Sequence, residues 1–552
     1  METCGGGSLR VNKALWTLKG KSILVVDDFP DIRALVREML KNFGATTIDV
    51  ARNAEQCLEL LADKRYDVVL CDYNLGDGKD GQQILEEARV RELVPYSSIF
   101  IMITAENTMN MVMGAVEYEP DAYLSKPFTQ VVLESRLRKL EQKKAVLREI
   151  SAAMDARNLE RALALCEQAL TQEKKHFFDI MKLRGDLQMR LHRFDAALAI
   201  FDEVIAIRPL SWALLGRGKA LYELGEHAEA EQSFREAIAA NAHFVAAFDW
   251  LARAEQAQGR IEAAQQTLKQ AVELSPKNTA RQKTLAEASL QTNDLATAEA
   301  AYKAVVVDGR HSIHRKPKDF GALAELKVHL DKPQEAAKLL GAVGREFKHA
   351  SGEDQLIAAM VESKIAGALG QDDVSAAALD RAMALHAKHP GELCSEDALD
   401  LAASCFAAGR KEDAVGLMQA AVRSHHEDPA FLEQARAVFD QAGLADEGEQ
   451  LIDTEHKAMI RLNNEGVALA RDGKLRDSVV LFLKAAQSMP ENTTINLNAA
   501  QSLLMLMSQQ GADRRSLEQV RIYLTRARGR AANQDRFDKI YNQYRQLATG
   551  TE

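Results

Sequence analysis

The sequence predicts a chain of two parts that differ in fold class: an α/β domain with an open parallel sheet, followed by a long all-α solenoid. Within the first 130 residues, four short apolar runs each lead to polar residues that can take part in chemistry. From about residue 149, strand patterns nearly disappear and Ala, Leu, Glu, Gln and Arg dominate, which is typical of helices. In that second part, pairs of packing residues recur at intervals of 33 or 34 residues, the period of stacked helical hairpins.

The four apolar runs are predicted to be strands of one parallel sheet. They cover residues 23–26, 66–71, 99–103 and 122–124. The polar residues that follow them are Asp27 and Asp28, Asp72, Thr104 and, after one serine, Lys126. In an open parallel sheet, residues just beyond the carboxyl ends of the strands share one crevice. We therefore expect three carboxylates, one hydroxyl and one ammonium group in a single pocket.

Three carboxylates at such close range repel one another, so protons or a divalent cation must neutralise part of their charge. Mg²⁺ fits best, because it takes oxygen ligands and accepts one or two carboxylates with waters and a phosphate oxygen. With Lys126 beside the cation, a phosphoryl group would bind while Asp72 attacks the phosphorus in line, and Thr104 would hydrogen-bond a transferred oxygen. The alternative is that these acids are only helix N-caps or residues of solvated turns, which is less favoured for five residues after four successive strands.

Four stretches of the sequence resemble the receiver domain of bacterial two-component response regulators, which has a flavodoxin-like (βα)5 fold. These stretches are residues 23–28, 69–74, 103–106 and 123–128. The resemblance covers residues 21–142 and implies that Asp72 is the phosphoacceptor. It also implies that Asp28 and Asp72 bind Mg²⁺ directly, together with the backbone carbonyl of Asn74, and that Asp27 contributes through a water molecule.

The same resemblance assigns roles to residues of the last two strand patterns. It makes Thr104 the switch hydroxyl, Lys126 the phosphoryl-binding lysine and Tyr123 the aromatic residue that rotates between two states. The peptide bond between Lys126 and Pro127 is expected to be cis, a form that costs little before proline.

Two further positions are expected to tune how long the phosphoryl group survives. Asn74 lies two residues past the acceptor and Glu106 two past the switch threonine, and in receivers these positions border the path of the hydrolytic water. Both are polar here, as in receivers that resemble the chemotaxis regulator, so a short lifetime is expected. The loop after the acceptor departs from the family pattern, because residues 75–81 contain three glycines, lack the usual proline and are one residue longer. Such a loop is more mobile than usual.

The second part is predicted to be a solenoid of the tetratricopeptide type, because a small and a large residue recur four positions apart. The pairs are Ala197 with Phe201, Ala230 with Phe234, Ala264 with Leu268, and Ala298 with Tyr302. The small alanine lets two helices approach, and the larger partner fills the gap between neighbouring hairpins. A generic helical bundle is the alternative, and the break in the period keeps it open for residues 310–455.

A clearer repeat returns near the carboxyl end, where Gly466 and Phe482 lie sixteen residues apart, the same glycine-to-aromatic spacing as in the first repeats. The chain is therefore expected to contain five segments. These are a flexible leader (1–20), the receiver domain (21–142), tetratricopeptide repeats (143–306), degenerate helical repeats (307–455), and a last repeat with capping helices (456–552).

Two basic segments of the second part raise the question of nucleic-acid binding. Residues 310–318 are more typical of a solvated connection than of a site. Residues 513–545 carry nine basic and four acidic side chains together with Tyr523, Tyr541 and Tyr544, and arginine with tyrosine can bind phosphate and stack on bases. A capping helix with a polar outer face is the favoured interpretation, because no nucleic-acid-reading motif accompanies the charge.

Length and composition narrow the class of protein further. The chain has 552 residues, enough for several domains, and a formal net charge of −10, which does not favour nucleic acid as a partner. No run of eighteen apolar residues occurs, so membrane insertion is not expected, and the glycine-rich leader does not resemble a secretory signal. The six cysteines lack C-x-x-C spacing, which favours reduced thiols and a cytoplasmic location.

The functional prediction combines these parts. Outside the receiver segment the sequence has no phosphate-binding loop and no H-E-x-x-H or G-x-S-x-G motif, so no catalytic output domain is expected. The chain resembles response regulators whose output is a tetratricopeptide module. This implies phosphoryl transfer from a sensor histidine kinase or phosphotransfer protein, and regulation by protein–protein contact through the concave repeat surface. The alternative is a nucleic-acid-binding regulator that uses the basic carboxyl-terminal helix, and homodimer formation stays open.

Overall fold

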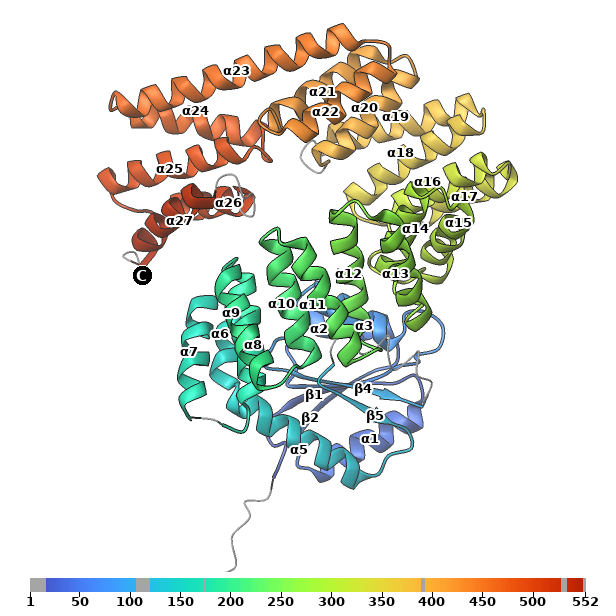
Figure 1. Ribbon diagram of the computed structural model, residues 1–552, viewed down its shortest axis with the longest axis vertical. Coiled ribbons are helices and arrows are strands. Elements are labelled where there is room, and N and C mark those ends of the chain that lie inside the picture. Colours follow the sequence, from blue (N-terminus) through green and yellow to red (C-terminus); the bar gives the residue numbers. More distant parts are fainter. Residues whose placement is uncertain (1–15, 106–119, 173, 389–392, 528–533, 550–552) are drawn as a thin grey trace, which may run out of the picture. The chain divides into compact units, whose positions relative to one another are not determined.

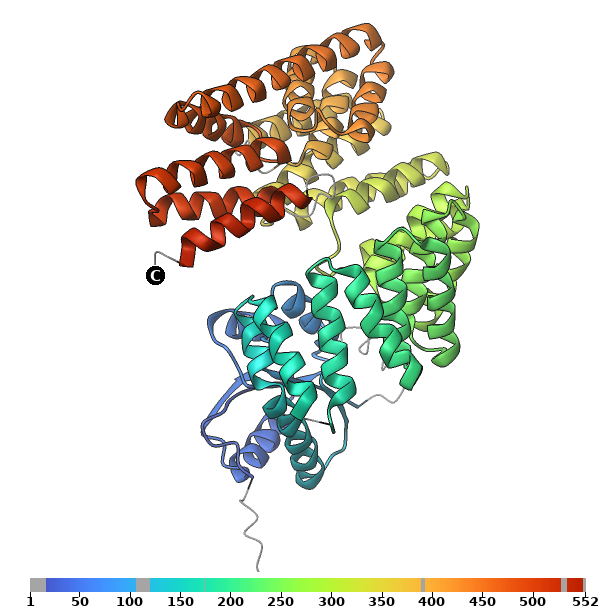
Figure 2. The ribbon, with the colours of Figure 1, turned by 60° about the vertical axis from the view of Figure 1, so that its left-hand side comes forward.

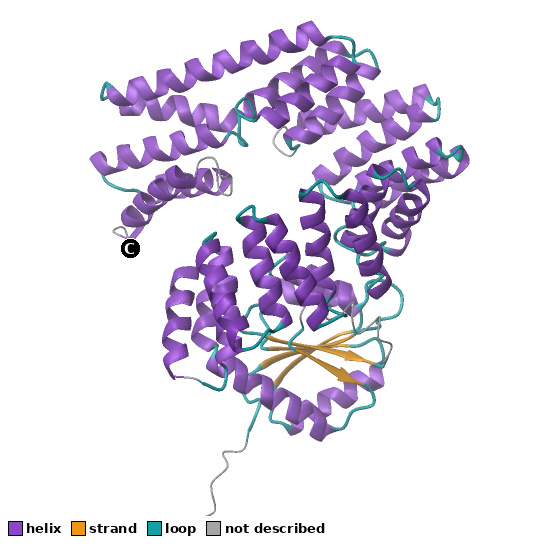
Figure 3. Ribbon diagram, in the orientation of Figure 1, coloured by secondary structure: helices purple, strands orange, loops and turns teal. Residues whose placement is uncertain are grey.

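The computed structural model describes residues 16–105, 120–172, 174–388, 393–527 and 534–549 (Figure 1). The chain divides into two compact units, residues 1–319 and residues 320–552. Every strand that the structure describes lies in the first unit, as the orange arrows of Figure 3 show. Most of the predicted leader at residues 1–20 lies outside the described part of the chain, and so does Glu106.

The first unit contains a five-stranded parallel sheet, which confirms the predicted fold class of this part. Its strands are β1 (Ser22–Val26), β2 (Thr47–Ala51), β3 (Val68–Asp72), β4 (Ile99–Thr104) and β5 (Ala122–Ser125), in the order β2-β1-β3-β4-β5. β3 and β4 are buried along their whole length, because helices cover both faces of a parallel sheet. The edge strand β2 is only half-buried and has no continuous apolar run, so the apolar pattern predicted only the other four strands.

Helices pack on both faces of the sheet. They are α1 (Pro30–Asn42), α2 (Ala54–Asp63), α3 (Gly81–Val90) and α5 (Gln130–Val146). Side chains alternate between the two faces along each strand, so Ile23 and Val25 of β1 join the core beneath α1 and α5. Leu24 and Val26 join the core beneath α2 and α3. The carboxyl ends of the strands therefore open between two helical layers, where such sheets bind ligands.

The connection from the sheet to the solenoid contains no flexible linker. α5 continues to Val146, and α6 (Arg148–Asp155) begins after the single residue Leu147. Leu147 has φ −91° and ψ 7°, and its buried side chain packs with Ile150 among the first solenoid helices. The chain turns at this residue although the sequence has neither glycine nor proline there.

The rest of the first unit is a stack of helical hairpins, which lie side by side in both ribbon views (Figures 1 and 2). After α6 its helices are α7 (Leu159–Gln172), α8 (Phe177–Arg190), α9 (Phe194–Ile207), α10 (Ser211–Glu223), α11 (His227–Ala240), α12 (Val245–Ala257), α13 (Ile261–Leu274), α14 (Thr279–Gln291), α15 (Leu295–Lys303) and the π-helix η1 (Ala304–Asp308).

The residues of the four predicted packing pairs are buried in this stack. The small members are 0% exposed, and they are Ala197, Ala230, Ala264 and Ala298. The large members are at most 4% exposed, and they are Phe201, Phe234, Leu268 and Tyr302. Each pair lies on the second helix of a hairpin, α9, α11, α13 or α15. The pairs therefore lie on the helices through which each hairpin can contact the next one.

Glycines let the ring of the first pair reach the backbone of neighbouring helices. Phe201 lies between Gly185 of α8 and Gly216 of α10, and a Cβ atom at either glycine would come within 2.5 Å of its ring. The same kind of contact joins Gly466 and Phe482 in the second unit. The sixteen-residue spacing between glycine and aromatic residue in the sequence thus corresponds to an aromatic ring packed directly on a helix backbone.

The large residue of the pair changes along the stack, while its burial does not. Phe234 repeats the contact of the first pair, because a Cβ atom at Gly218 of α10 would overlap its ring. The equivalent position is Leu268 in α13 and Tyr302 in α15, which are 1% and 4% exposed. The repeat therefore specifies a large buried side chain at this position, and an aromatic ring is only one way to provide it.

The second unit is helical in all the elements that the structure describes. Its helices are α16 (Pro317–His329, which begins just before the unit boundary), α17 (Pro333–Glu346), α18 (Gly352–Ala368), α19 (Asp372–Lys388), α20 (Ser395–Ala407), α21 (Lys411–Ser424), α22 (Pro429–Gln441), α23 (Ala445–Arg471), α24 (Leu475–Ser488), α25 (Thr493–Gln510), α26 (Arg514–Ala527) and α27 (Gln534–Thr549). α18 and α19 have 17 residues and α23 has 27, which breaks the regular period. No helix in the described residues combines the length and apolar character needed to cross a membrane.

The last two helices pack against the repeat that precedes them. Tyr523 of α26 is 6% exposed and lies with Val520 and Leu524 in an apolar core. Arg536 of α27 is half-buried and donates to the side-chain oxygen of Gln501 at 3.0 Å. These side chains of α26 and α27 therefore take part in packing within the second unit.

A methyl group added at Gly216 should destabilise the first unit. We expect Gly216→Ala to lower the free energy of unfolding by about 1–3 kcal/mol, because the ring of Phe201 would have to move within a filled core. The control is Gly341→Ala in α17, where a Cβ meets no atom within 4 Å and alanine favours the helix. Chemical denaturation followed by circular dichroism measures both, and equal effects of the two substitutions would contradict this packing.

Candidate functional site

Three carboxylates and one ammonium group meet at the carboxyl ends of the strands. Asp27 and Asp28 follow β1 and Asp72 ends β3, and one carboxylate oxygen of each lies within 4.8 Å of the other two. The Nζ atom of Lys126 lies 2.8 Å from Asp27 Oδ2 and 3.0 Å from Asp72 Oδ1. The convergence of these four side chains, expected from the strand ends, is therefore present in the structure.

The register of the sheet brings these side chains together. The last residue of β1 pairs with the next-to-last residue of β3, so Asp27 and Asp72 are neighbours at the same edge. On the other side of β3, the backbone N–H of Lys126 donates to the carbonyl of Thr104 at 2.7 Å. This hydrogen bond fixes the chain just after β5, from which the lysine side chain reaches the carboxylates.

The site is buried and carries excess negative charge. Asp27 and Asp72 are 2% and 5% exposed. Burial raises the pKa of Asp72 to about 6; the ion pair with Lys126 opposes this, and the charges of Asp27 and Asp28 add to it. Burial by itself would lower the pKa of Lys126, but its bonds to Asp27 and Asp72 outweigh burial and raise that pKa. One ammonium group thus faces three carboxylates, and a further cation would relieve their repulsion.

The donor set fits a hard divalent cation. Asp28 Oδ1 is buried and has no hydrogen-bond partner in the described part of the chain, so the protein itself leaves an acceptor of the cluster unsatisfied. The clustered donors are all carboxylate oxygens, and Mg²⁺ takes oxygen ligands. Asn74 is exposed in the loop after Asp72, and its side-chain oxygen accepts from the N–H of Gly76 at 3.3 Å. The side chain of Asn74 is therefore engaged within its own loop.

The remaining residues predicted for the site lie on the last two strands. Thr104 ends β4 and is 6% exposed. Tyr123 of β5 packs against the apolar core beneath α2 and α3, and its hydroxyl is buried with no hydrogen-bond partner among the described residues. Burial raises the pKa of Tyr123 well above its usual range. The bond between Lys126 and Pro127 is cis, and the position of Glu106 lies outside the described residues.

Two further residues contact the backbone of Asp27 and Asp72. Arg33 of α1 donates to the carbonyl of Asp27 at 2.5 Å. Gly81 begins α3 so close to Asp72 that a Cβ atom would overlap the carbonyl of Asp72, and its N–H donates to the carbonyl of Tyr73 at 2.7 Å. Gly81 could have been identified from the sequence, because it is the glycine that ends the loop after Asp72. No sequence pattern marks Arg33.

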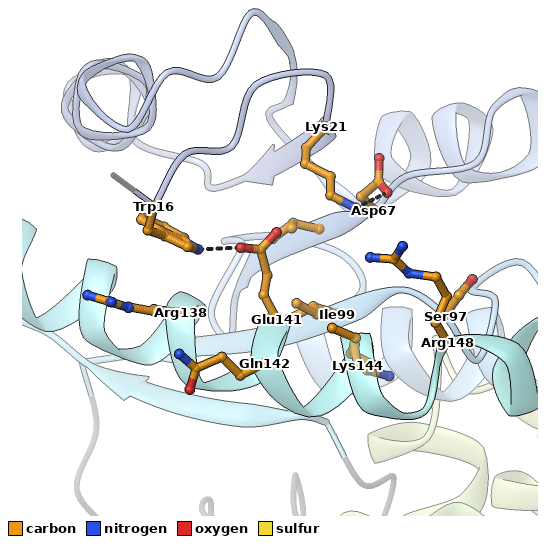
Figure 4. Close-up of a pocket in the computed structure, with 12 residues that line it drawn as sticks. Trp16, Lys21, Asp67, Ser97, Ile99, Arg138, Glu141, Gln142, Lys144 and Arg148 are labelled. Carbon is orange, nitrogen blue, oxygen red and sulfur yellow. Dashed lines mark hydrogen bonds and ion pairs between the residues drawn. The ribbon is translucent and has the colours of Figure 1, made fainter. Parts of the chain in front are cut away.

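A separate pocket lies at the opposite, amino-terminal edge of the sheet (Figure 4). Its volume is about 500 Å³, and α5 and the residues that precede β1, β3 and β4 form its walls. Within it, Trp16 donates to Glu141 at 2.5 Å and Lys21 pairs with Asp67 at 2.9 Å. These acidic groups already bind donors of the same pocket, so it does not share the excess negative charge of the Asp72 crevice.

Comparison with known proteins agrees with this geometry. The profile of the response regulator receiver domain matches residues 23–138. Chemotaxis protein CheY-3 of Vibrio cholerae serotype O1 is 30% identical over 122 residues, which cover 22% of this chain and 92% of that protein. Chemotaxis protein CheY of Pseudomonas aeruginosa is 29% identical over 118 residues, which cover 21% of this chain and 94% of that protein. The fold and the site thus define a receiver domain, and the chain belongs to the response regulator receiver family.

The helical part has its own relatives. Profiles of the tetratricopeptide repeat match residues 147–211, 183–243 and 256–314. One similar solved structure is a tetratricopeptide repeat protein from Parabacteroides merdae, with 15% identity, 44% of this chain and 92% of that chain covered, and a TM-score of 0.31. Chemotaxis protein CheY4 of Vibrio cholerae is instead a solved structure similar to the receiver part, with 22% identity, 22% of this chain and 97% of that chain covered, and a TM-score of 0.20. The protein is a response regulator in which tetratricopeptide repeats follow the receiver domain.

The raised pKa of Asp72 predicts how loss of its charge changes stability. The pKa is about 6 in the folded chain against an ordinary value of 3.8, so the folded state binds this proton more tightly and ionised Asp72 destabilises it. Without divalent cations, we expect Asp72→Asn to raise the free energy of unfolding at neutral pH by about 1–3 kcal/mol. The gain should shrink as the pH falls through 6 and vanish near pH 4. Urea denaturation across this range measures it, and a gain independent of pH would contradict the assignment.

Proposed function

We propose that Asp72 accepts a phosphoryl group from a histidine kinase or phosphotransfer protein, and that the tetratricopeptide repeats convert this state into altered binding of protein partners. The observation that supports this most directly is the cluster of the buried Asp27 and Asp72 with the partly buried Asp28, in which the Nζ atom of Lys126 lies 2.8 Å from Asp27 and 3.0 Å from Asp72. Such a cluster provides a nucleophile, a place for a cation and a fixed positive charge in one crevice.

In the proposed transfer, a carboxylate oxygen of Asp72 forms a bond to phosphorus while the bond from phosphorus to the donor histidine nitrogen breaks. The imidazole leaves with that electron pair and takes up a proton, and the product on Asp72 is an acyl phosphate. Lys126 places its positive charge beside the phosphoryl oxygens, and Thr104 offers a hydroxyl to one of them. Both groups stabilise charge that builds up as the phosphoryl group moves.

We propose that Asp28, Asp72 and the backbone carbonyl of Asn74 bind the metal directly, and that Asp27 binds it through a water molecule. A Mg²⁺ ion held there would neutralise charge on the phosphoryl oxygens. The buried, unsatisfied Oδ1 atom of Asp28 supports this assignment. We assign Asn74 and Glu106 to the tuning of hydrolysis, because their polar side chains would border the water that attacks the acyl phosphate.

The repeats are the proposed output. Stacked helical hairpins present extended surfaces that bind peptides or helices through many modest contacts. The division into a receiver domain, regular repeats, degenerate repeats and a capped last repeat stays part of this proposal. Binding of nucleic acid by residues 513–545 is less favoured, because Tyr523 is buried and Arg536 is bound to Gln501.

The acceptor assignment predicts a specific loss of labelling. Asp72→Asn keeps the size and hydrogen bonding of the side chain but removes the nucleophile, so labelling by a cognate kinase or a small phosphodonor with Mg²⁺ should disappear. Asp28→Asn should instead slow transfer and weaken Mg²⁺ binding, because a ligand is lost and the nucleophile remains. Acid-stable, base-labile label is the readout, and undiminished label on Asp72→Asn would show that another residue is the acceptor.

The abutting helices α5 and α6 predict a change that reaches the solenoid. Lys144 of α5 pairs with Asp121 at 2.9 Å, beside β5, and the adjacent Lys143 pairs with Asp179 of α8 at 2.6 Å. A phosphoryl group adds about −1.5 to −2 charge at Asp72, and repacking at β4 and β5 would move α5 as a stiff element.

We therefore expect a phosphoryl mimic to alter hydrogen-exchange protection around residues 104–128 and in the first hairpins, residues 150–210. Exchange measured by mass spectrometry on the full chain, with and without the mimic, gives the readout. The Asp72→Asn variant is the control, because it should not respond. Changes confined to the receiver would mean that the two parts are merely tethered.

A further inference from the structure

Residues of the distant repeats contact the loop that follows Asp72 and the helix α3 that comes after this loop. The loop runs from the end of β3 to the start of α3, residues 73–80. The contacting residues are Lys277, between α13 and α14, and the segment 310–314, between η1 and α16. All of them belong to the first compact unit. The receiver thus touches the solenoid at a second place, far along the chain from the α5–α6 connection.

Lys277 contacts both ends of this loop. Its Nζ atom lies 3.8 Å from Asp80 Oδ2 and 5.6 Å from the centre of the ring of Tyr73. Tyr73 directly follows the acceptor, and Asp80 is the N-cap of α3, whose other oxygen accepts from the N–H of Gln83 at 2.9 Å. One cationic side chain of the solenoid therefore bridges the first and the last residue of the loop.

The segment 310–314 adds a second contact further along α3. Glu86 has a side chain that is 5% exposed, and its Oε1 atom lies 3.2 Å from Nε2 of His314. Its other oxygen accepts from the hydroxyl of Ser312 at 3.5 Å, and that hydroxyl also accepts from the N–H of His314 at 3.2 Å. The basic segment that the sequence presented as a solvated connection is thus bound to the receiver.

The loop whose two ends Lys277 contacts contains two glycines with positive φ. Gly76 and Gly78 have φ values of 73° and 119°, which glycine adopts without strain, and both are exposed. Ordering a glycine-rich segment costs conformational entropy. Lys277 holds Asp80 at the end of the loop. This contact reduces the entropy that is lost when Asn74, near the start of the loop, takes part in a metal site. The ammonium group of Lys277 also favours added negative charge nearby. Both effects therefore strengthen binding of metal and phosphoryl groups at Asp72.

We propose that Lys277, Ser312 and His314 form a latch that reads the state of Asp72 through the loop after it, and that the latch strengthens binding of the metal and phosphoryl groups at Asp72. This inference rests on the proposed function of Asp72. Coupling between two sites is reciprocal, so phosphorylation in turn tightens the repeats on α3. The latch thus adds to the covalent connection at α5 a further contact through which the solenoid senses the receiver.

The test measures binding of beryllium fluoride, a phosphoryl mimic, with Mg²⁺ to the full-length chain by isothermal titration calorimetry. We expect Lys277→Ala to bind the mimic about fivefold more weakly than the wild type. The matched control is Lys303→Ala, which removes an exposed lysine from the end of α15 in the same unit and should leave the affinity unchanged. In the wild type, the mimic should slow hydrogen exchange around residues 277–280 and 309–316, and Lys277→Ala should abolish this protection.

A second variant separates the latch from a general folding defect. Asp80→Asn removes the charge that faces Lys277 but keeps the N-cap, because asparagine caps helices as well as aspartate does. If the pair acts as proposed, Lys277→Ala should weaken mimic binding less in the Asp80→Asn background than in the wild type, which a double-mutant cycle measures.

The outcomes distinguish the two proposals. Failure of the wild type to bind the mimic, or equal binding by Asp72→Asn, would overturn the function proposed for Asp72 and the latch with it. Binding that requires Asp72 but is the same in Lys277→Ala and Lys303→Ala, with no protection at residues 309–316, would overturn the latch alone.

Discussion

The pairing of Lys126 with Asp27 and Asp72 is the interaction on which the site depends. It joins residues that follow β1, end β3 and follow β5, so it holds the carboxyl edge of the sheet together at the point where like charges push it apart. The compensation is incomplete, since Asp28 adds a third carboxylate and the pKa of Asp72 stays raised to about 6. A fold that buries such an imbalance gives up stability at this site, and the function proposed for Asp72 would account for that cost.

The residues of the crevice could be predicted from the sequence because their placement follows from local rules. A short apolar run predicts a buried strand, and the residue after such a strand lies at the carboxyl edge of a parallel sheet. That rule alone placed Asp27, Asp28, Asp72 and Thr104 together, and the resemblance to receivers then assigned their roles. The small and large residues of the repeat pairs were predictable for a similar reason, since each hairpin contacts only its neighbours.

The contacts between the solenoid and α3 could not be predicted in this way. Ser312 and Glu86 lie 226 residues apart in the chain, and their meeting depends on the summed rotation of every hairpin between them. Two local features were also not predicted by the periodicity of the sequence. The π-helix η1 alters the end of the regular stack, and the turn at Leu147 occurs without glycine or proline. Such features follow from the packing of whole helices, which the periodicity of a sequence does not specify.

Because only Leu147 separates α5 from α6, the length of α5 determines the direction in which α6 leaves the receiver. Each residue added to an α-helix rotates everything beyond it by about 100° and advances it by about 1.5 Å. An insertion in α5 would therefore turn α6 away from the receiver and remove Asp155 from the N–H of Tyr96, from which it now accepts at 2.7 Å. Receivers from other regulators would be interchangeable with this one only if the phase of their last helix matched. Modular exchange of this domain is thus limited by helical phase, independently of the chemistry at its acidic site.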